Sequence, residues 1–186
     1  MPYKFTVPEY KRVRVIVSTD AACEADDPFA IAHALLSPKL DVKAVIAEHF
    51  MGEGTMERSY AAAKHLLALM KSPVPVLHGQ VWPKNGQISE GTQFIIDEAR
   101  RDDPRRLFVL LMGATTTMAD ALRAAPDIQD KLTIVTIGGN AYGKDAWEME
   151  ISPIPAQTVF PARIIEQAGD LINDAGLLNN ENGYLP

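Results

Sequence analysis

Four acidic side chains stand close together after the first apolar run of the chain, at residues 13–17: Asp20, Glu24, Asp26 and Asp27. Carboxylates that are brought together repel one another and raise each other's pKa values unless a cation joins them. Oxygen ligands without a cluster of histidine or cysteine suit Ca²⁺ or Mg²⁺ better than zinc. The pattern therefore indicates a site for a divalent cation.

Further polar residues follow the later apolar runs. Glu48 and His49 come directly after the second run, and Met112 and Gly113 come after the fourth. The residues that follow the fifth run are Gly138, Gly139, Asn140, Asp145, Glu148 and Glu150. Because ligands bind outside the carboxyl ends of strands in open parallel sheets, we expect one acidic, ligand-binding edge. His49 is the histidine best placed there to contact a ligand.

The same residues also have simpler structural interpretations. Asp27 stands before Pro28, which is typical of a helix N-cap, and acidic residues in a first turn favour the helix dipole. Capping accounts for one carboxylate and leaves the others unpaired, and it is compatible with metal binding. The threonines at 115–117 are predicted to cap the helix that they begin. Cys23 has no nearby base or cation, so nucleophilic chemistry is not expected of it.

Five short apolar runs alternate with helical patterns along the chain, and this alternation predicts the fold. Continuous apolar strands are typical of parallel sheets that are buried on both faces. We therefore predict an α/β fold with an open, mostly parallel sheet and helices on both faces, in Rossmann-like order. The strands are expected at 13–17, 42–47, 74–77, 107–112 and 132–137, and the helices at 27–38, 55–70, near 94–99, at 115–125 and at 162–175.

Composition excludes several classes of protein. With 18 basic and 24 acidic residues the net charge is −6, which argues against general binding to nucleic acid or to anionic lipid. No apolar stretch reaches the roughly 20 residues that cross a bilayer, and no signal peptide is evident. A single cysteine predicts a reducing compartment, so we expect a cytoplasmic protein without membrane contact. No phosphate-loop motif accompanies the glycines at 138–139, which ranks a nucleotide-binding Rossmann domain far below the other hypotheses.

The ordered motifs resemble those of the calcium-dependent nucleoside hydrolases of the inosine/uridine-preferring type. The stretch Val15-Ile-Val-Ser-Thr-Asp20, followed by Asp26-Asp27, is similar to the family's D-T-D-x-G-x-D-D signature. Val74-Pro-Val-Leu-His-Gly79 and Leu110-Leu-Met-Gly113 are similar to its third and fourth strands. Ile137-Gly-Gly139 and Trp147-Glu-Met-Glu150 are similar to its M-G-G and E-F-N elements. The resemblance runs from about residue 13 to residue 151.

This resemblance implies an enzyme that uses Ca²⁺ to hydrolyse the N-glycosidic bond of ribonucleosides. It implies that Asp20 and Asp27 bind the ion together with the main-chain carbonyl of Met112, and that Asp20 also helps to activate the attacking water. It further implies that Asp26 contacts the ribose hydroxyls and that Glu148 holds the sugar. Glu150 stands where the family has asparagine, and we expect it beside the sugar or the metal.

The chain departs from the family pattern in ways that keep a second hypothesis open. Two additional residues separate Asp20 from Asp26, Ser18 replaces the first aspartate of the signature, and no histidine follows His78. We expect residues 1–186 to form one domain that lacks the family's C-terminal portion, with a sheet edge or apolar face that favours a homo-oligomer. The alternative to a hydrolase is a non-catalytic relative that binds sugars or nucleosides, or serves in assembly, without turnover.

Overall fold

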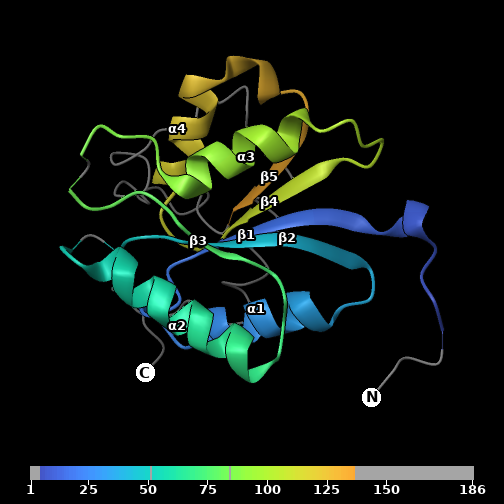
Figure 1. Ribbon diagram of the computed structural model, residues 1–186, viewed down its shortest axis with the longest axis horizontal. Helices are drawn as coiled ribbons and strands as arrows, with labels where there is room; N and C mark the ends of the chain where they lie inside the picture. Colours follow the sequence, from blue (N-terminus) through green and yellow to red (C-terminus); the bar gives the residue numbers. More distant parts are fainter. Residues whose placement is uncertain (1–4, 51, 84, 137–186) are drawn as a thin grey trace, which may run out of the picture.

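A parallel sheet of five strands forms the centre of the protein, in the order β3-β2-β1-β4-β5. The computed structural model describes residues 5–50, 52–83 and 85–136 (Figure 1). Each neighbouring pair of strands is parallel, and β1 occupies the middle of the sheet. The strands are β1 (Val13–Thr19), β2 (Leu40–Ala47), β3 (Val76–His78), β4 (Leu107–Leu111) and β5 (Leu132–Thr136).

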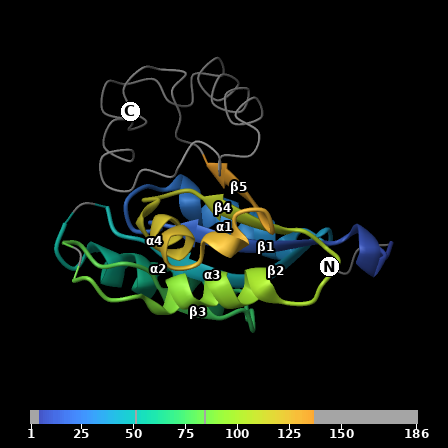
Figure 2. The ribbon, with the colours of Figure 1, turned by 90° about the horizontal axis from the view of Figure 1, so that it is seen from above.

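Four helices cover the two faces of the sheet. Figure 1 shows α1 and α2 on one face and α3 and α4 on the other. From above, α3 and α4 lie side by side, and they are in contact (Figure 2). The helices are α1 (Asp26–Leu36), α2 (Thr55–Leu69), α3 (Glu90–Arg100) and α4 (Thr116–Ala124), with two short 3₁₀ turns, η1 (Glu9–Lys11) and η2 (Pro126–Ile128).

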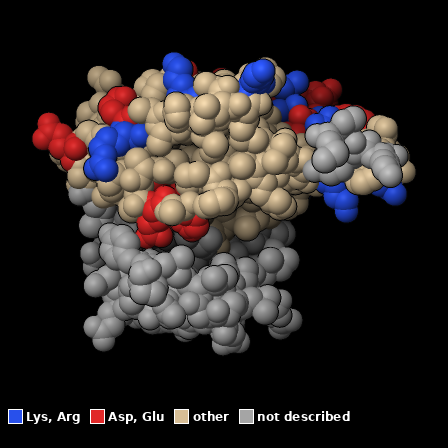
Figure 3. Space-filling view, turned by 90° about the horizontal axis from the view of Figure 1, so that it is seen from below, with Lys and Arg blue, Asp and Glu red and all other residues tan. Residues whose placement is uncertain are grey.

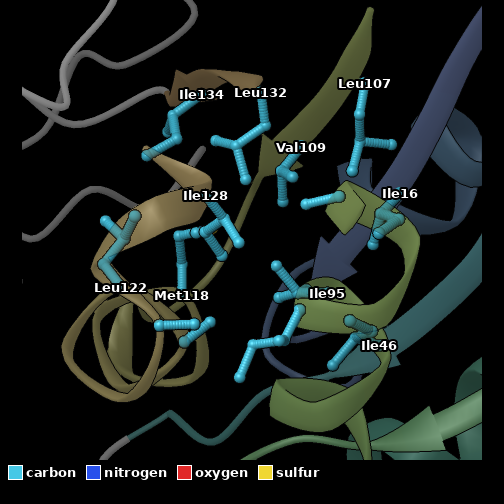
Figure 4. Packing of buried hydrophobic residues seen from close by; sticks show 14 of the residues in the cluster. Ile16, Ile46, Ile95, Leu107, Val109, Met118, Leu122, Ile128, Leu132 and Ile134 are labelled. Carbon is cyan, nitrogen blue, oxygen red and sulfur yellow. The ribbon is translucent and has the colours of Figure 1, made fainter. Parts of the chain in front are cut away.

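Alternate residues of the strands pack into two separate hydrophobic clusters, one on each face of the sheet. On the α3/α4 face, Ile16 and Val109 pack with Ile95 and Met118 (Figure 4). On the α1/α2 face, the neighbouring positions of β1 pack against both helices of that face, in a cluster that includes Val15, Val17, Ile31, Ala63 and Leu67. Because side chains alternate along a strand, a strand covered on both faces is apolar at successive positions in its centre. This explains the apolar run at residues 15–17 of β1.

The structure confirms the predicted α/β fold and the elements predicted up to β5. The third strand begins at Val76 rather than at residue 74. The third helix begins at Glu90, where the Ser89 hydroxyl accepts a hydrogen bond from the Thr92 amide at 3.1 Å. The predicted loop at 138–161 and the predicted helix at 162–175 lie outside the described residues, so the single domain over residues 1–186 stays a prediction.

The outer surface of α1 and α2 carries several large apolar side chains. Phe29 and Leu36 on α1 and Leu69 on α2 are each more than half exposed. Figure 3 views this side of the molecule, where much of the surface is uncharged and the acidic and basic side chains stand in separate groups. No helix of the described residues combines the length and the hydropathy that crossing a bilayer requires.

A buried ion pair holds the amino-terminal edge of the sheet together. The Arg14 guanidinium, on β1, is almost fully buried and donates to Glu98 Oε1 on α3 at 3.1 Å. It also donates to the main-chain carbonyl of Arg105, at 2.9 and 2.7 Å. Arg105 in turn hydrogen-bonds Asp103 and holds the pKa of that carboxyl well below its usual value. Every carboxylate in this group therefore has an arginine beside it.

The first prediction concerns this ion pair. Glu98→Gln removes one of the two carboxylates beside the buried Arg14 guanidinium and leaves Asp103 at 3.6 Å, so we expect the free energy of unfolding to fall by about 2 kcal/mol. Urea denaturation followed by circular dichroism measures the change. Arg100→Gln, which breaks the exposed pair with Asp127, is the control and is expected to change stability little. Equal losses in the two variants would contradict the assignment.

Candidate functional site

The carboxyl edge of the sheet gathers the polar residues that follow β1, β2 and β4. Asp20 comes directly after β1, Glu48 after β2 and Met112 after β4. β1 is hydrogen-bonded to the segments that follow its two neighbours: the Glu48 amide donates to the Thr19 carbonyl at 2.7 Å, and the Met112 amide donates to the Ser18 carbonyl at 2.9 Å. The structure therefore confirms that these three residues lie along one edge of the sheet.

Asp20 and Asp27 form a pair of carboxyl groups in contact. The two side chains share a hydrogen bond, and Asp27 is only 5% exposed. Burial, and then the charge and hydrogen bond of Asp27, raise the pKa of Asp20 to about 8. Burial also raises the pKa of Asp27, although a hydrogen bond from the Thr19 hydroxyl opposes this. Asp26 is exposed at the start of α1.

The turn after β4 is shaped to admit the Asp20 carboxyl group. A Cβ atom at position 113 would lie 2.8 Å from Asp20 Cγ and 2.8 Å from its amide nitrogen. Such a contact is too short for any side chain, so only glycine lets this turn approach the acidic residue. Gly113 therefore places the turn, and with it the main chain of Met112, directly against Asp20.

The predicted helix cap at Asp27 is wrong. The helix α1 begins at Asp26, and no side chain caps its first turn. The Asp27 carboxylate instead accepts a hydrogen bond from the Thr19 hydroxyl. Because α1 packs on the sheet, Asp27 faces inward, toward the end of β1 and the Asp20 carboxyl group. The Asp27 side chain therefore joins α1 to the end of β1 and does not cap its own helix.

The predicted cap by the threonines at 115–117 is also wrong. The first turn of α4 has no side-chain cap. The Thr116 hydroxyl lies 2.7 Å from His49 Nε2, and the Thr117 hydroxyl donates to Glu48 Oε2 at 2.7 Å. The segment after β2 takes up these hydroxyl groups, so they are not available to the α4 backbone.

The sequence analysis placed Glu48 at this edge but assigned it no role in the site. Its side chain is fully buried, and its second oxygen accepts a hydrogen bond from the Ser18 hydroxyl at 2.8 Å. Burial raises the pKa of Glu48 to about 8, against the lowering effect of the hydrogen bonds from Thr117 and Ser18. The sequence shows only that Glu48 follows a strand. Many exposed residues also follow strands, so this position does not predict that Glu48 is buried.

The four histidines occupy different surroundings. His49 is buried, and its ring centroid lies 5.2 Å from that of Trp82. His33 and His65 are exposed on their helices, as predicted. His78 is partly exposed at the end of β3, where its ring nitrogens face the carboxylates of two surface glutamates. Of the four, only His49 lies inside the polar network of the carboxyl edge.

Cys23 is a poor nucleophile in this setting. Burial, followed by the charges of Asp20 and Glu24, raises the pKa of its thiol to about 12. The thiol is therefore neutral at ordinary pH, and the thiolate is the reactive form. This agrees with the expectation from the sequence that Cys23 does not act as a nucleophile.

The two edges of the sheet differ in how their carboxylates are compensated. At the amino-terminal edge, arginines pair with the acidic groups, and two hollows of about 870 and 470 Å³ lie there, lined mainly by η1, residues 99–106 and Lys131. Among the described residues, no lysine or arginine forms an ion pair with Asp20, Asp27 or Glu48. Both hollows lie away from the acidic pair.

The acidic pair suits a hard cation. Two partly buried carboxylates in contact need a proton or a cation between them, and oxygen ligands favour Ca²⁺ or Mg²⁺. Within the described part of the chain, no group of three His, Cys, Asp or Glu side chains converges on one point. The pair would therefore share the ion with main-chain oxygen, water or substrate. The predicted site residues Glu148 and Glu150 lie outside the described residues.

Comparison with known proteins identifies the family. Residues 15–164 match the model of the family described as inosine-uridine preferring nucleoside hydrolase. The chain belongs to this family. The pyrimidine-specific ribonucleoside hydrolase RihA of Salmonella arizonae is 26% identical over 171 residues, which cover 75% of this chain and 54% of that protein. The chain thus spans about half the length of the curated relatives that it matches.

Solved structures share the fold. A purine-preferring ribonucleoside hydrolase from Gardnerella vaginalis superposes with a TM-score of 0.57 and 24% identity, over 68% of this chain and 48% of that one. The type III effector protein XopQ, solved with adenosine diphosphate ribose, has a TM-score of 0.58 and 18% identity, over 89% of this chain and 56% of that one. These similarities extend the observed α/β fold to the family.

The second prediction follows from the burial of Glu48. Its pKa is higher in the folded chain than in the unfolded chain, so the folded state holds the proton more tightly. The contribution of Glu48 to stability is then fully present below pH 4.5 and falls by about 4 kcal/mol as the pH rises to 8. Glu48→Gln removes the titration, so its free energy of unfolding should change less between pH 5 and pH 8 than that of the unmodified protein.

Denaturant titrations at both pH values test this, with Glu57→Gln as the control, because Glu57 is exposed on α2. Parallel pH profiles of the unmodified protein and Glu48→Gln would contradict the raised pKa.

Proposed function

We propose that the protein hydrolyses the N-glycosidic bond of ribonucleosides, with Ca²⁺ held at the carboxyl edge of the sheet. The observation that carries the proposal is the buried contact between the Asp20 and Asp27 carboxyl groups. Family membership gives the reaction class, and the pair gives a place for the ion. Asp20, Asp27 and the main-chain carbonyl of Met112 would hold the cation, and a calcium ion in such a site lowers the pKa of its bound water.

In the proposed reaction, different residues of this chain have different roles. In this proposal the Asp20 carboxylate would accept the proton of the attacking water, as the family resemblance implies; it lies directly after β1, and no lysine or arginine of the described residues forms an ion pair with it. Asp26, exposed beside the pair, contacts the ribose hydroxyls. The negative charge of these groups favours the positive charge that develops on the sugar as the bond to the base breaks. His49, Glu148 and Glu150 complete the proposed contacts to substrate.

Three further properties are predicted from the sequence alone: a cytoplasmic location, the absence of nucleic-acid and membrane partners, and assembly into a homo-oligomer. The net charge of −6 supports the second of these. The exposed apolar side chains of α1 and α2 are compatible with the third.

A sugar- or nucleoside-binding role without turnover is the second candidate. It is favoured by the small number of carboxylates that the described residues bring together, which is two. Fold and family do not guarantee catalysis, since function depends on the complete site. Release of reducing sugar from a panel of ribonucleosides separates the two candidates: turnover that requires Asp20 eliminates the binding role.

The third prediction tests the cation site. Asp20→Asn and Asp27→Asn each remove one carboxylate from the pair, so we expect both to lower Ca²⁺ affinity at least tenfold and to abolish sugar release. Isothermal titration calorimetry measures the affinity. The control is Asp97→Asn, an exposed residue on α3 far from this edge. Calcium binding that is the same in all three variants would exclude the site.

A further inference from the structure

Glu48 lies at the point where β1, β2 and α4 come together. Its amide joins the end of β1 through the Thr19 carbonyl, at 2.7 Å. Its carboxyl group accepts hydrogen bonds from two hydroxyl groups on different elements, Ser18 on β1 at 2.8 Å and Thr117 on α4 at 2.7 Å. The side chain has no exposure to solvent, so Glu48 contacts only other parts of the protein.

A buried carboxyl group in this position has an energetic cost. Removing it from water disfavours its charged form, and two neutral hydroxyl groups compensate only in part. The surroundings nonetheless leave room for it: a Cβ atom at Gly79 would lie 2.9 Å from Glu48 Oε2. An apolar side chain of similar size would fill the same space without that cost. Glu48 therefore contributes to the site through its hydrogen bonds and not through stability.

The two hydrogen-bond partners of Glu48 flank the proposed cation site. Ser18 stands two residues before Asp20. Thr117 follows the turn that carries Met112 and packs Gly113 against Asp20. The same carboxyl group thus connects the segment that presents the Asp20 carboxylate with the segment that presents the Met112 carbonyl.

Neighbouring contacts reinforce this connection. The Thr117 hydroxyl also accepts a hydrogen bond from the Gln80 amide at 2.9 Å, which brings in the segment after β3. His49, the next residue after Glu48, is hydrogen-bonded through Nε2 to Thr116, at 2.7 Å. The start of α4 is therefore attached to the segment after β2 at two successive residues.

We propose that Glu48 is a positioning residue of the cation site: it holds the end of β1 and the start of α4 at a fixed separation, and so sets the spacing between the Asp20 carboxylate and the Met112 carbonyl. The inference rests on the proposed function, because it concerns the geometry of that site. Groups that orient metal ligands through hydrogen bonds change metal affinity by about 10- to 100-fold when they are removed.

The fourth prediction is a calcium titration of matched variants. Glu48→Met keeps the volume of the side chain and removes both hydrogen bonds, so Ca²⁺ affinity should fall at least tenfold in calorimetry. Thr117→Val removes one of these hydrogen bonds and should also lower the Ca²⁺ affinity. Thr117→Ser keeps the hydroxyl group and should have the Ca²⁺ affinity of the unmodified protein. Glu98→Gln is the control: it disturbs a buried carboxylate at the opposite edge, so it should lower stability and leave Ca²⁺ affinity unchanged.

A second measurement does not depend on calcium. Without the ion, Glu48→Met should speed amide hydrogen exchange in the segments 18–20 and 112–118, and Glu98→Gln should not change exchange there selectively. The positioning role is overturned if Ca²⁺ affinity is unchanged in Glu48→Met, or if Glu98→Gln loses as much affinity as Glu48→Met; in either case the proposed function still stands. If the unmodified protein binds no calcium, both the proposed function and the positioning role fail.

Discussion

Two carboxyl groups in a partly buried contact are the constraint on which the carboxyl edge of this protein depends. Asp20 and Asp27 come from the end of a strand and the start of a helix, and packing of α1 on the sheet forces them together. Neither has an arginine or lysine beside it in the described part of the chain. Electrostatics then requires a shared proton or a cation. The turn at Gly113 and the hydroxyl group of Thr19 are arranged around this pair.

The two edges of the sheet differ in how their buried carboxyl groups are compensated. At its amino-terminal edge, Arg14 and Arg105 surround Glu98 and Asp103, so that burying charge there is compensated at short range. At its carboxyl edge, none of the lysines and arginines of the described residues pairs with Asp20 or Glu48, and the pKa values of these two groups are raised, mainly by burial. Parallel strands produce this division because all of their carboxyl ends, and the loops that follow them, meet on one side.

Much of the fold could be predicted because its signals are local. The apolar residues Val15, Ile16 and Val17 follow one another, which is typical of a strand covered on both faces, and an apolar stripe such as that of α2 is typical of a helix that packs on a sheet. The capping predictions failed for the opposite reason. Asp27 and Thr117 have the residue types of helix caps, but partners that are distant in sequence, Thr19 and Glu48, take up their side chains. A local pattern carries no information about such partners.

The sequence by itself determined the order of the elements, the family and the presence of acidic residues after the first strand, since these follow from residue type and spacing. Only the tertiary structure decided which of those residues meet. It paired Asp20 with Asp27, left Asp26 exposed and buried Glu48 between two hydroxyl groups. The physical reason is that the pKa and the hydrogen bonds of a side chain depend on what packs against it, and those neighbours come from α1 and α4, whose approach to the strand ends is set by the whole sheet.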